Sequence, residues 1–120
     1  MAESRVLVVE DDQILRTVIA DALLEDGYTV ETAADGQAAL ESARRSPPDL
    51  VILDLMMPYM DGEVFSAAMR GIDGLASTPI ILISASRHAE DIGARIGAHI
   101  IMRKPFDLFE LTEQVNTLLR

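Results

Sequence analysis

The stretch Arg5-Val6-Leu7-Val8-Val9-Glu10-Asp11-Asp12 decides the fold class, because a short apolar run ends abruptly in three acids. A continuous apolar run rich in β-branched residues indicates a strand buried on both faces, as in a parallel sheet covered by helices. Beyond it, apolar residues recur at helical spacing up to the stop signal Asp26-Gly27. The pattern predicts a strand followed by a helix, with Asp12 placed to cap that helix.

The same pair of elements recurs along the rest of the chain. We expect further strands at 28–32, 50–53, 80–83 and 100–102, and further helices at 35–43, 65–69, 88–96 and 108–118. The strand at 28–32 is more polar than the others, which places it nearer an edge of the sheet. Alternating strands and helices predict a single α/β domain over residues 1–120, with a parallel sheet between two layers of helices.

Composition narrows the class of protein. The 120 residues include 20 acidic and 10 basic side chains, giving a net charge of −10, and there is no cysteine. Direct nucleic-acid binding is disfavoured, because phosphate contacts need clustered Lys and Arg, and thiol chemistry is excluded. The apolar runs are far shorter than the roughly 18 residues of a membrane span, and the N-terminus resembles no secretory signal. We therefore expect a cytoplasmic protein with no membrane contact.

Charged and hydroxyl residues follow four of the five predicted strands. They are Glu10, Asp11 and Asp12 after the first strand, Asp54 after the third, Ser84 after the fourth and Lys104 after the fifth. Ligands of open α/β sheets bind beyond the carboxyl ends of the strands. Clustered carboxylates suit a hard cation such as Mg²⁺, and a lysine with a hydroxyl can neutralise phosphoryl oxygens. The set indicates phosphoryl transfer to a carboxylate.

Each of these residues also has a simpler structural interpretation. Asp12 is an expected helix cap, Asp54 fits a turn ahead of Pro58, and Ser84 fits a turn or cap hydroxyl. Lys104 is harder to explain as a surface residue, because it is the only lysine beside nine arginines. The combination at one edge of the sheet favours the functional interpretation.

These motifs resemble the receiver domain of two-component response regulators. Besides the acidic triplet, the resemblance rests on Asp54-Leu55-Met56-Met57-Pro58, Asp61-Gly62, Ser84-Ala85 and Lys104-Pro105-Phe106, and it covers nearly the whole chain. It implies a flavodoxin-like (βα)5 three-layer sandwich with a five-stranded parallel sheet of order 2-1-3-4-5. In the family, the peptide bond before the proline at position 105 is usually cis.

The resemblance implies a phosphoacceptor signalling domain that is not an enzyme, although it assists its own phosphorylation and dephosphorylation. Asp54 is expected to take a phosphoryl group from the phosphohistidine of a histidine kinase or histidine phosphotransfer protein. Ser84 is expected to be the switch hydroxyl, with Ala85 leaving room for it, and Lys104 to pair with the phosphoryl group. The last two helices and the fifth strand would then switch for a downstream protein effector, and the family often forms homodimers through this face.

The resemblance also implies a set of metal ligands. Asp11 and Asp54 are expected to hold Mg²⁺ directly, Glu10 through water, and Met56 through its backbone carbonyl. Mn²⁺ is expected to be able to substitute.

One position departs from the family pattern. Three residues before Lys104, where the family commonly has an aromatic switch residue, this chain has Ile101. An aliphatic side chain cannot reproduce the swing of a ring with a polar tip. We therefore expect the phosphoryl transfer chemistry to be retained and signal propagation to differ. Met56 and Ser86 occupy positions that, in the family, tune the lifetime of the acyl phosphate.

Three other functions stay open at this stage. A receiver-like domain can signal by phosphorylation-independent protein binding. An aspartyl-nucleophile phosphatase would need a general acid close to Asp54, but Met56 stands where enzymes resembling haloacid dehalogenases place a second aspartate. A flavin-binding module of the same topology would place a phosphate after the first strand, where Glu10-Asp11-Asp12 would repel it.

Overall fold

In the computed structural model, which describes residues 3–55 and 61–120, five strands alternate with five helices. The strands are β1 (Arg5–Val9), β2 (Thr29–Ala33), β3 (Leu50–Asp54), β4 (Ile80–Ser84) and β5 (Ile100–Arg103). The helices are α1 (Gln13–Glu25), α2 (Gly36–Arg45), α3 (Gly62–Arg70), α4 (Ala89–Ile96) and α5 (Leu108–Leu119). The predicted alternation is confirmed. The largest difference lies at α3, which begins three residues before the expected start at Phe65, because Asp61 caps it.

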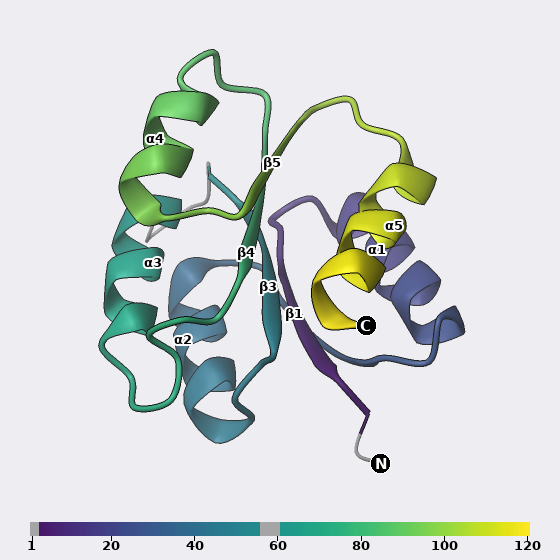
Figure 1. Ribbon diagram of the computed structural model, residues 1–120, viewed down its shortest axis with the longest axis horizontal. Coiled ribbons are helices and arrows are strands. Elements are labelled where there is room, and N and C mark those ends of the chain that lie inside the picture. Colours follow the sequence, from purple (N-terminus) through teal and green to yellow (C-terminus); the bar gives the residue numbers. More distant parts are fainter. Residues whose placement is uncertain (1–2, 56–60) are drawn as a thin grey trace.

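The five strands form one parallel sheet of order β2-β1-β3-β4-β5, which confirms both the predicted order and the edge position of β2 (Figure 1). Pairing in register brings the strand ends together. Val9 pairs with Leu53 across β1 and β3, and Asp54 pairs with Ile83 across β3 and β4. The residues that follow these strands therefore meet at the carboxyl end of the sheet.

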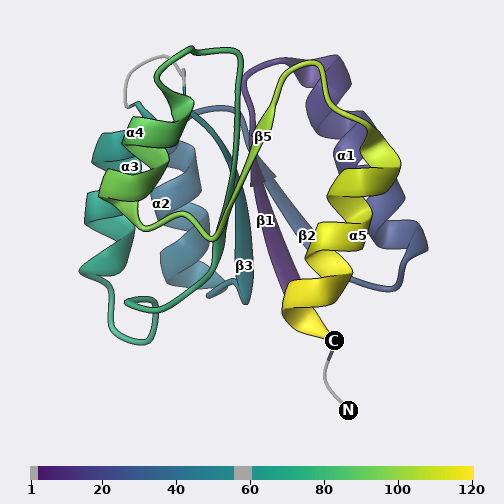
Figure 2. The ribbon, with the colours of Figure 1, turned by 45° about the horizontal axis from the view of Figure 1, so that its top comes forward.

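Helices cover both faces of the sheet, with α1 and α5 on one side and α2, α3 and α4 on the other (Figure 2). Alternation along each strand supplies the two cores. Val8 of β1 packs with Ile19 of α1 and Val115 of α5, whereas Leu7 lies on the opposite face with Phe65 of α3. Each such side chain contributes about 1.5–3 kcal/mol when fully buried. The unbroken apolar runs of the sequence thus become strands buried on both faces.

Aspartates begin four of the helices. The carboxylates of Asp12, Asp35, Asp61 and Asp107 each accept a hydrogen bond from a backbone N–H of the first turn, an arrangement that stabilises a helix by about 1 kcal/mol. The cap predicted for Asp12 is confirmed. Helix α4 differs, since His88 provides no side-chain cap.

Helix α4 ends at Gly97, whose φ of 71° is a left-handed conformation that glycine adopts without strain. Among residues 3–55 and 61–120, no helix combines the length and apolar character that a membrane span requires.

Candidate functional site

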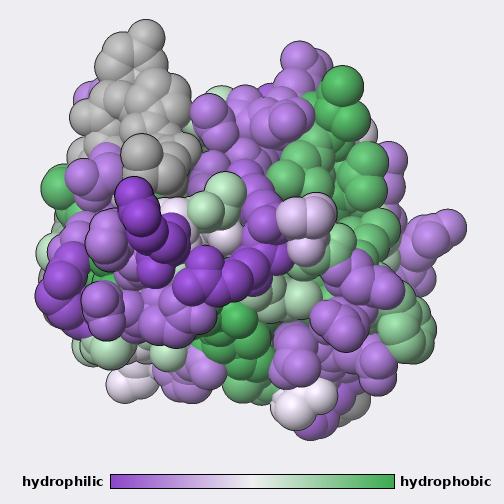
Figure 3. Space-filling model, turned by 90° about the horizontal axis from the view of Figure 1, so that it is seen from above, coloured by the Kyte–Doolittle hydropathy of each residue, from purple (hydrophilic) through white to green (hydrophobic). Residues whose placement is uncertain are grey.

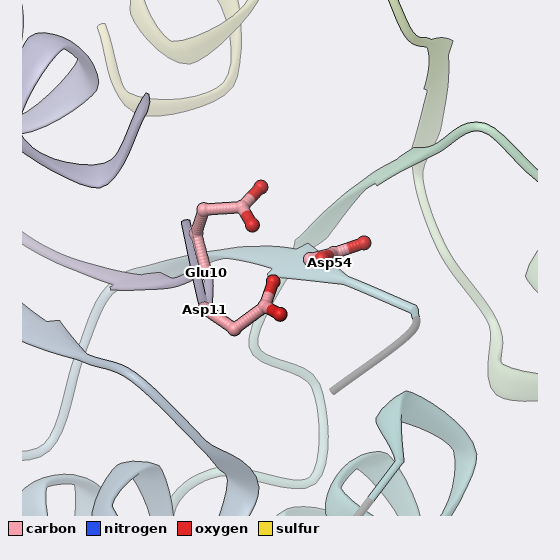
Figure 4. A group of neighbouring side chains, drawn as sticks. All are labelled: Glu10, Asp11 and Asp54. Carbon is pink, nitrogen blue, oxygen red and sulfur yellow. The ribbon is translucent and has the colours of Figure 1, made fainter. Parts of the chain in front are cut away.

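Three carboxylates converge where β1 and β3 end (Figure 4). Glu10 and Asp11 follow β1, Asp54 ends β3, and an oxygen of each lies within 4.8 Å of the others. Glu10 is fully buried and Asp54 is 3% exposed, whereas Asp11 is exposed, so the cluster opens to solvent on the Asp11 side. The acids grouped by the sequence pattern therefore meet, except Asp12, whose carboxylate is engaged at the start of α1.

The only lysine of the chain lies against this cluster. Lys104 Nζ is 2.8 Å from Glu10 Oε1 and 3.5 Å from Asp54 Oδ2. Burial by itself would lower the pKa of Lys104, but the two carboxylates outweigh burial and raise that pKa above its ordinary value. Lys104 is therefore positively charged at neutral pH, at the carboxyl end of the sheet.

Backbone hydrogen bonding positions the Cα atom of Lys104 beside the end of β4. Lys104 N donates a hydrogen bond of 2.9 Å to the Ser84 carbonyl, which extends the pairing of β5 with β4 by one residue. The bond between Lys104 and Pro105 is cis, as the resemblance implied.

The donor set of the cluster fits a hard divalent cation. Hydrogen bonding with the Glu10 carboxyl group lowers the pKa of Asp11, against a smaller opposing effect of burial, and Asp54 adds to the lowering. Asp11 is thus ionised at neutral pH, which is the form that binds a cation. Glu10 is fully buried, and its Oε1 faces the Lys104 ammonium at 2.8 Å. The expected backbone ligand Met56 lies outside the described residues.

Comparison with known proteins assigns the family. A family model for the response regulator receiver domain matches residues 6–116. The chain belongs to the response regulator receiver domain family. This receiver domain is 41% identical to the alkaline phosphatase synthesis transcriptional regulatory protein SphR of Synechococcus elongatus, over 98% of the chain and 49% of SphR. It is 39% identical to the transcriptional regulatory protein PrrA of Mycobacterium tuberculosis, over 97% of the chain and 50% of PrrA. The chain spans about half the length of these relatives.

Solved structures agree with this assignment. The chemotaxis protein CheY4 of Vibrio cholerae superposes with a TM-score of 0.91 at 34% identity, covering 98% of this chain and 100% of that one. The response regulator TrrA of Thermotoga maritima, solved in complex with Mg²⁺ and BeF, gives a TM-score of 0.84 at 34% identity, covering 97% and 99% of the two chains. The flavodoxin-like fold of the receiver domain is confirmed.

Ser84 of this receiver domain is buried at the end of β4, on the strand beside Asp54. Its Oγ accepts a hydrogen bond of 2.9 Å from the backbone N–H of Ser86. The hydroxyl oxygen thus serves as a turn acceptor, which is the simpler interpretation of the sequence. This bond uses a lone pair of the hydroxyl oxygen and leaves its hydrogen to donate elsewhere.

Arg16 is a site residue that sequence reasoning missed. It lies on α1, and its Nη1 donates a hydrogen bond of 2.8 Å to the carbonyl of Glu10. The N–H of Asp12 donates to Glu10 Oε2 at 3.1 Å. Together these bonds orient the loop that carries the acidic pair. Arg16 lies in the first turn of α1, and the carbonyl that it contacts lies six residues earlier in the loop. No pattern in the sequence indicates this contact.

Gly62 determines how closely α3 approaches Asp54. Its N–H donates a hydrogen bond of 2.9 Å to the carbonyl of Leu55. A Cβ at this position would lie 3.0 Å from Leu55 Cα and 3.3 Å from the Asp54 carbonyl oxygen. The absence of a side chain therefore lets the first turn of α3 rest against the backbone of the Asp54 strand end.

Proposed function

We propose that Asp54 accepts a phosphoryl group from the phosphohistidine of a histidine kinase or histidine phosphotransfer protein. The observation that carries this proposal is the position of a buried Asp54 carboxylate among two further acids and one lysine. All three acids have oxygens within 4.8 Å of one another, and Lys104 Nζ lies 3.5 Å from Asp54 Oδ2. This is the surrounding that a carboxylate needs to act as a phosphoryl acceptor.

In the proposed transfer, an oxygen of Asp54 forms a bond to phosphorus while the bond between phosphorus and the donor imidazole nitrogen breaks. The electron pair of that bond stays on the imidazole nitrogen, which takes up a proton. Lys104, whose Nζ lies 3.5 Å from Asp54 Oδ2, pairs with a phosphoryl oxygen. Ser84 donates a hydrogen bond from its hydroxyl to a second oxygen. Catalysis in this scheme consists of positioning and charge neutralisation.

The residues proposed to hold Mg²⁺, or Mn²⁺ in its place, are Asp11 and Asp54 directly, Glu10 through water, and the Met56 carbonyl. When bound, the cation neutralises the carboxylates and attracts the phosphoryl oxygens. The donor set and the lowered pKa of Asp11 support this assignment. The TrrA complex with Mg²⁺ and BeF shows a relative of the same fold with such a group.

Apolar surface beside the site supports contact with a phosphodonor protein. A cavity of about 460 Å³ is lined by Leu15, Ala85, Lys104, Pro105 and Phe106. Ile14 and Phe109, at the starts of α1 and α5, are 78% and 68% exposed. Figure 3 shows apolar surface gathered on this α1–α5 side. Since Lys104 both lines the cavity and contacts Asp54, a helix that carries phosphohistidine and covers this surface brings its imidazole to the site.

The proposed output is a change of the α4–β5–α5 face that alters binding of a downstream protein effector, or pairing of two copies through that face. The curated relatives are transcriptional regulators of about twice this length, so we place the effector role in a gene-regulating protein. In this proposal residues 1–120 act as one receiver domain in the cytoplasm. Its net charge of −10 leaves DNA contact to other parts of the system.

Intact mass spectrometry tests the proposal. The protein is incubated with Mg²⁺ and either acetyl phosphate or phosphoramidate, a small donor with a phosphorus–nitrogen bond. We expect an adduct of about 80 Da that requires Mg²⁺ and is lost in Asp54→Asn. Asp12→Asn is the matched control, since asparagine also caps a helix, and it should keep the adduct.

An adduct that persists in Asp54→Asn would place the modification elsewhere. Absence of any adduct from either donor on folded protein would favour signalling by phosphorylation-independent binding. Turnover of a small phosphomonoester would instead indicate a phosphatase.

A further inference from the structure

Helix α4 packs on the core through Ala89, Ile92 and Ile96. Its N-terminus lacks a side-chain cap, and it is a helix of 8 residues, too short to be stable by itself. Its position therefore depends on what holds it laterally. Besides this packing, Ile101 lies against Gly93, and two exposed ion pairs join α4 to its neighbours, Arg95 with Glu63 and Arg103 with Glu90.

Ile101 is interlocked with α4. A Cβ built on Gly93 would lie 2.9 Å from Ile101 Cγ1 and closer still to its Cδ1, so the Ile101 side chain occupies the space that a larger residue on α4 would need. The side chain points into the sheet-facing side of α4 and has no polar atom. It can hold the helix, but it offers no group that could exchange hydrogen bonds with Ser84.

Arg103, two residues later on β5, contacts both α4 and the phosphoacceptor side. Its Nε donates to Glu90 Oε1 at 3.1 Å, and its Nη2 donates to Glu90 Oε2, which makes a two-pronged pair with the first turn of α4. Its Nη1 donates a hydrogen bond of 2.9 Å to the Ser86 carbonyl. One planar guanidinium thus bridges the helix and the turn that follows β4.

Ser86 connects this bridge to Ser84. The N–H of Ser86 donates to Ser84 Oγ at 2.9 Å, and its carbonyl accepts from Arg103. The Ser84 hydroxyl, the Ser86 peptide groups, the Arg103 guanidinium and the Glu90 carboxylate therefore form an unbroken series of hydrogen bonds. It runs from beside Asp54 to the exposed start of α4.

We propose that Arg103 is a positioning residue that couples the state of the Asp54 site to helix α4 in the place of an aromatic ring. The proposal rests on the function proposed above. When the Ser84 hydroxyl turns toward a phosphoryl oxygen, it releases the Ser86 N–H, and the turn moves. The Ser86 carbonyl then leaves Arg103, and the start of α4 loses its connection to the turn. Arg103 in this scheme stabilises the unphosphorylated arrangement.

Linkage gives the sign of the effect. A residue that stabilises only the unphosphorylated arrangement weakens the binding of any ligand that requires the other one. Removing Arg103 is therefore expected to strengthen the binding of beryllofluoride, a phosphoryl mimic, by about three- to tenfold. The same substitution is expected to shift the backbone amide resonances of α4 in the unliganded protein toward their positions in the beryllofluoride complex.

The test is a titration of ¹⁵N-labelled protein with beryllofluoride at saturating Mg²⁺, followed through the amides of residues 84–96. Arg103→Gln is expected to bind three- to tenfold more tightly, with a smaller change at α4. Arg103→Lys is expected to behave in the same way, since a lysine ammonium cannot bridge Glu90 and Ser86 as the planar guanidinium does. The matched control is Arg95→Gln, which removes the other exposed ion pair of α4, at 2.9 Å from Glu63, and should match the wild type.

Three results separate the possible failures. Wild-type affinity and wild-type α4 shifts in Arg103→Gln would overturn the coupling while leaving the proposed function intact. An equal effect of Arg95→Gln, or rescue by Arg103→Lys, would reduce Arg103 to a surface charge and would also overturn it. Absence of beryllofluoride binding by the wild type, together with absence of a phosphoryl adduct, would overturn the proposed function itself.

Discussion

Lys104 and Glu10 form an ion pair, with Nζ 2.8 Å from Oε1, in which the acid is fully buried and the lysine side chain is 25% exposed. A buried carboxylate without a cation is costly, so this contact stabilises the fold before any ligand arrives. The same lysine lies 3.5 Å from Asp54. The structural ion pair and the role proposed for Lys104 in phosphoryl transfer therefore depend on a single ammonium group.

The first prediction concerns alkaline stability. The pKa of Lys104 is raised in the folded protein, above the value of about 10.4 of an unfolded lysine. Its contribution is therefore fully present below pH 10 and is lost as the pH rises through the folded-state pKa. We expect the difference in unfolding free energy between wild type and Lys104→Met to be constant from about pH 7 to 9 and to shrink above pH 10. Urea titrations at each pH measure it. A difference that grows above pH 10 would contradict the assignment.

The second prediction concerns competition between Lys104 and the cation. Both carry positive charge to the same carboxylates, so Lys104→Met is expected to bind Mg²⁺ roughly tenfold more tightly in the absence of a phosphoryl group. Amide shifts of residues 10–12 during a Mg²⁺ titration measure the affinity. Arg5→Met, at the opposite end of β1 and 3.8 Å from Glu31, is the control and should not change it. Weaker binding by Lys104→Met would mean that the lysine orders the metal ligands.

The third prediction concerns Gly62. A Cβ there would lie 3.0 Å from the backbone of Leu55, so either α3 or the Asp54 strand end has to move. We expect Gly62→Ala to lower the unfolding free energy by about 1–3 kcal/mol and to slow the phosphorylation of Asp54 by about tenfold or more. Gly71→Ala is the matched control at the other end of α3, since its Cβ would be 3.5 Å from the nearest atom, an ordinary contact. Similar loss in both variants would point to α3 stability in place of the close approach.

The fourth prediction is a sign reversal at Gly93. Alanine in a helix interior is favoured over glycine by about 1 kcal/mol, but at this position the methyl group would overlap Ile101. We expect Gly93→Ala to destabilise the wild type by about 1–2 kcal/mol. In an Ile101→Ala background the same substitution should stabilise, because the space is then open. A double-mutant cycle by urea unfolding checks this, and additive effects would show that the two residues do not interlock.

The sequence was sufficient for the order and type of the ten elements, because continuous apolar runs and helical spacing are properties of neighbouring residues. It also grouped the site correctly in space, since Glu10, Asp54 and Lys104 all follow strands and parallel strands share one edge. The start of α3 was misplaced because Asp61-Gly62 has the composition of a loop, although Asp61 caps the helix.

Contacts between residues of different elements could not be predicted in the same way. Arg103 differs in no local property from the other arginines, and only the packing of β5 against α4 brings it to Glu90 and Ser86. The close contact between Gly93 and Ile101 likewise depends on which side chain of β5 faces the glycine. Patterns along the chain give the period of burial, whereas such contacts depend on the rotation of one helix about its axis.

The lysine beside Asp54 has a practical use. Because Lys104 is the sole lysine, an amine-directed reagent can modify only this side chain and the chain terminus. The extent of modification at Lys104, measured on intact protein, then reports how accessible its ammonium group is, without any engineered label. Any ligand that covers the Lys104 ammonium, including the cation and the phosphoryl group proposed above, would then lower the extent of modification at this one atom.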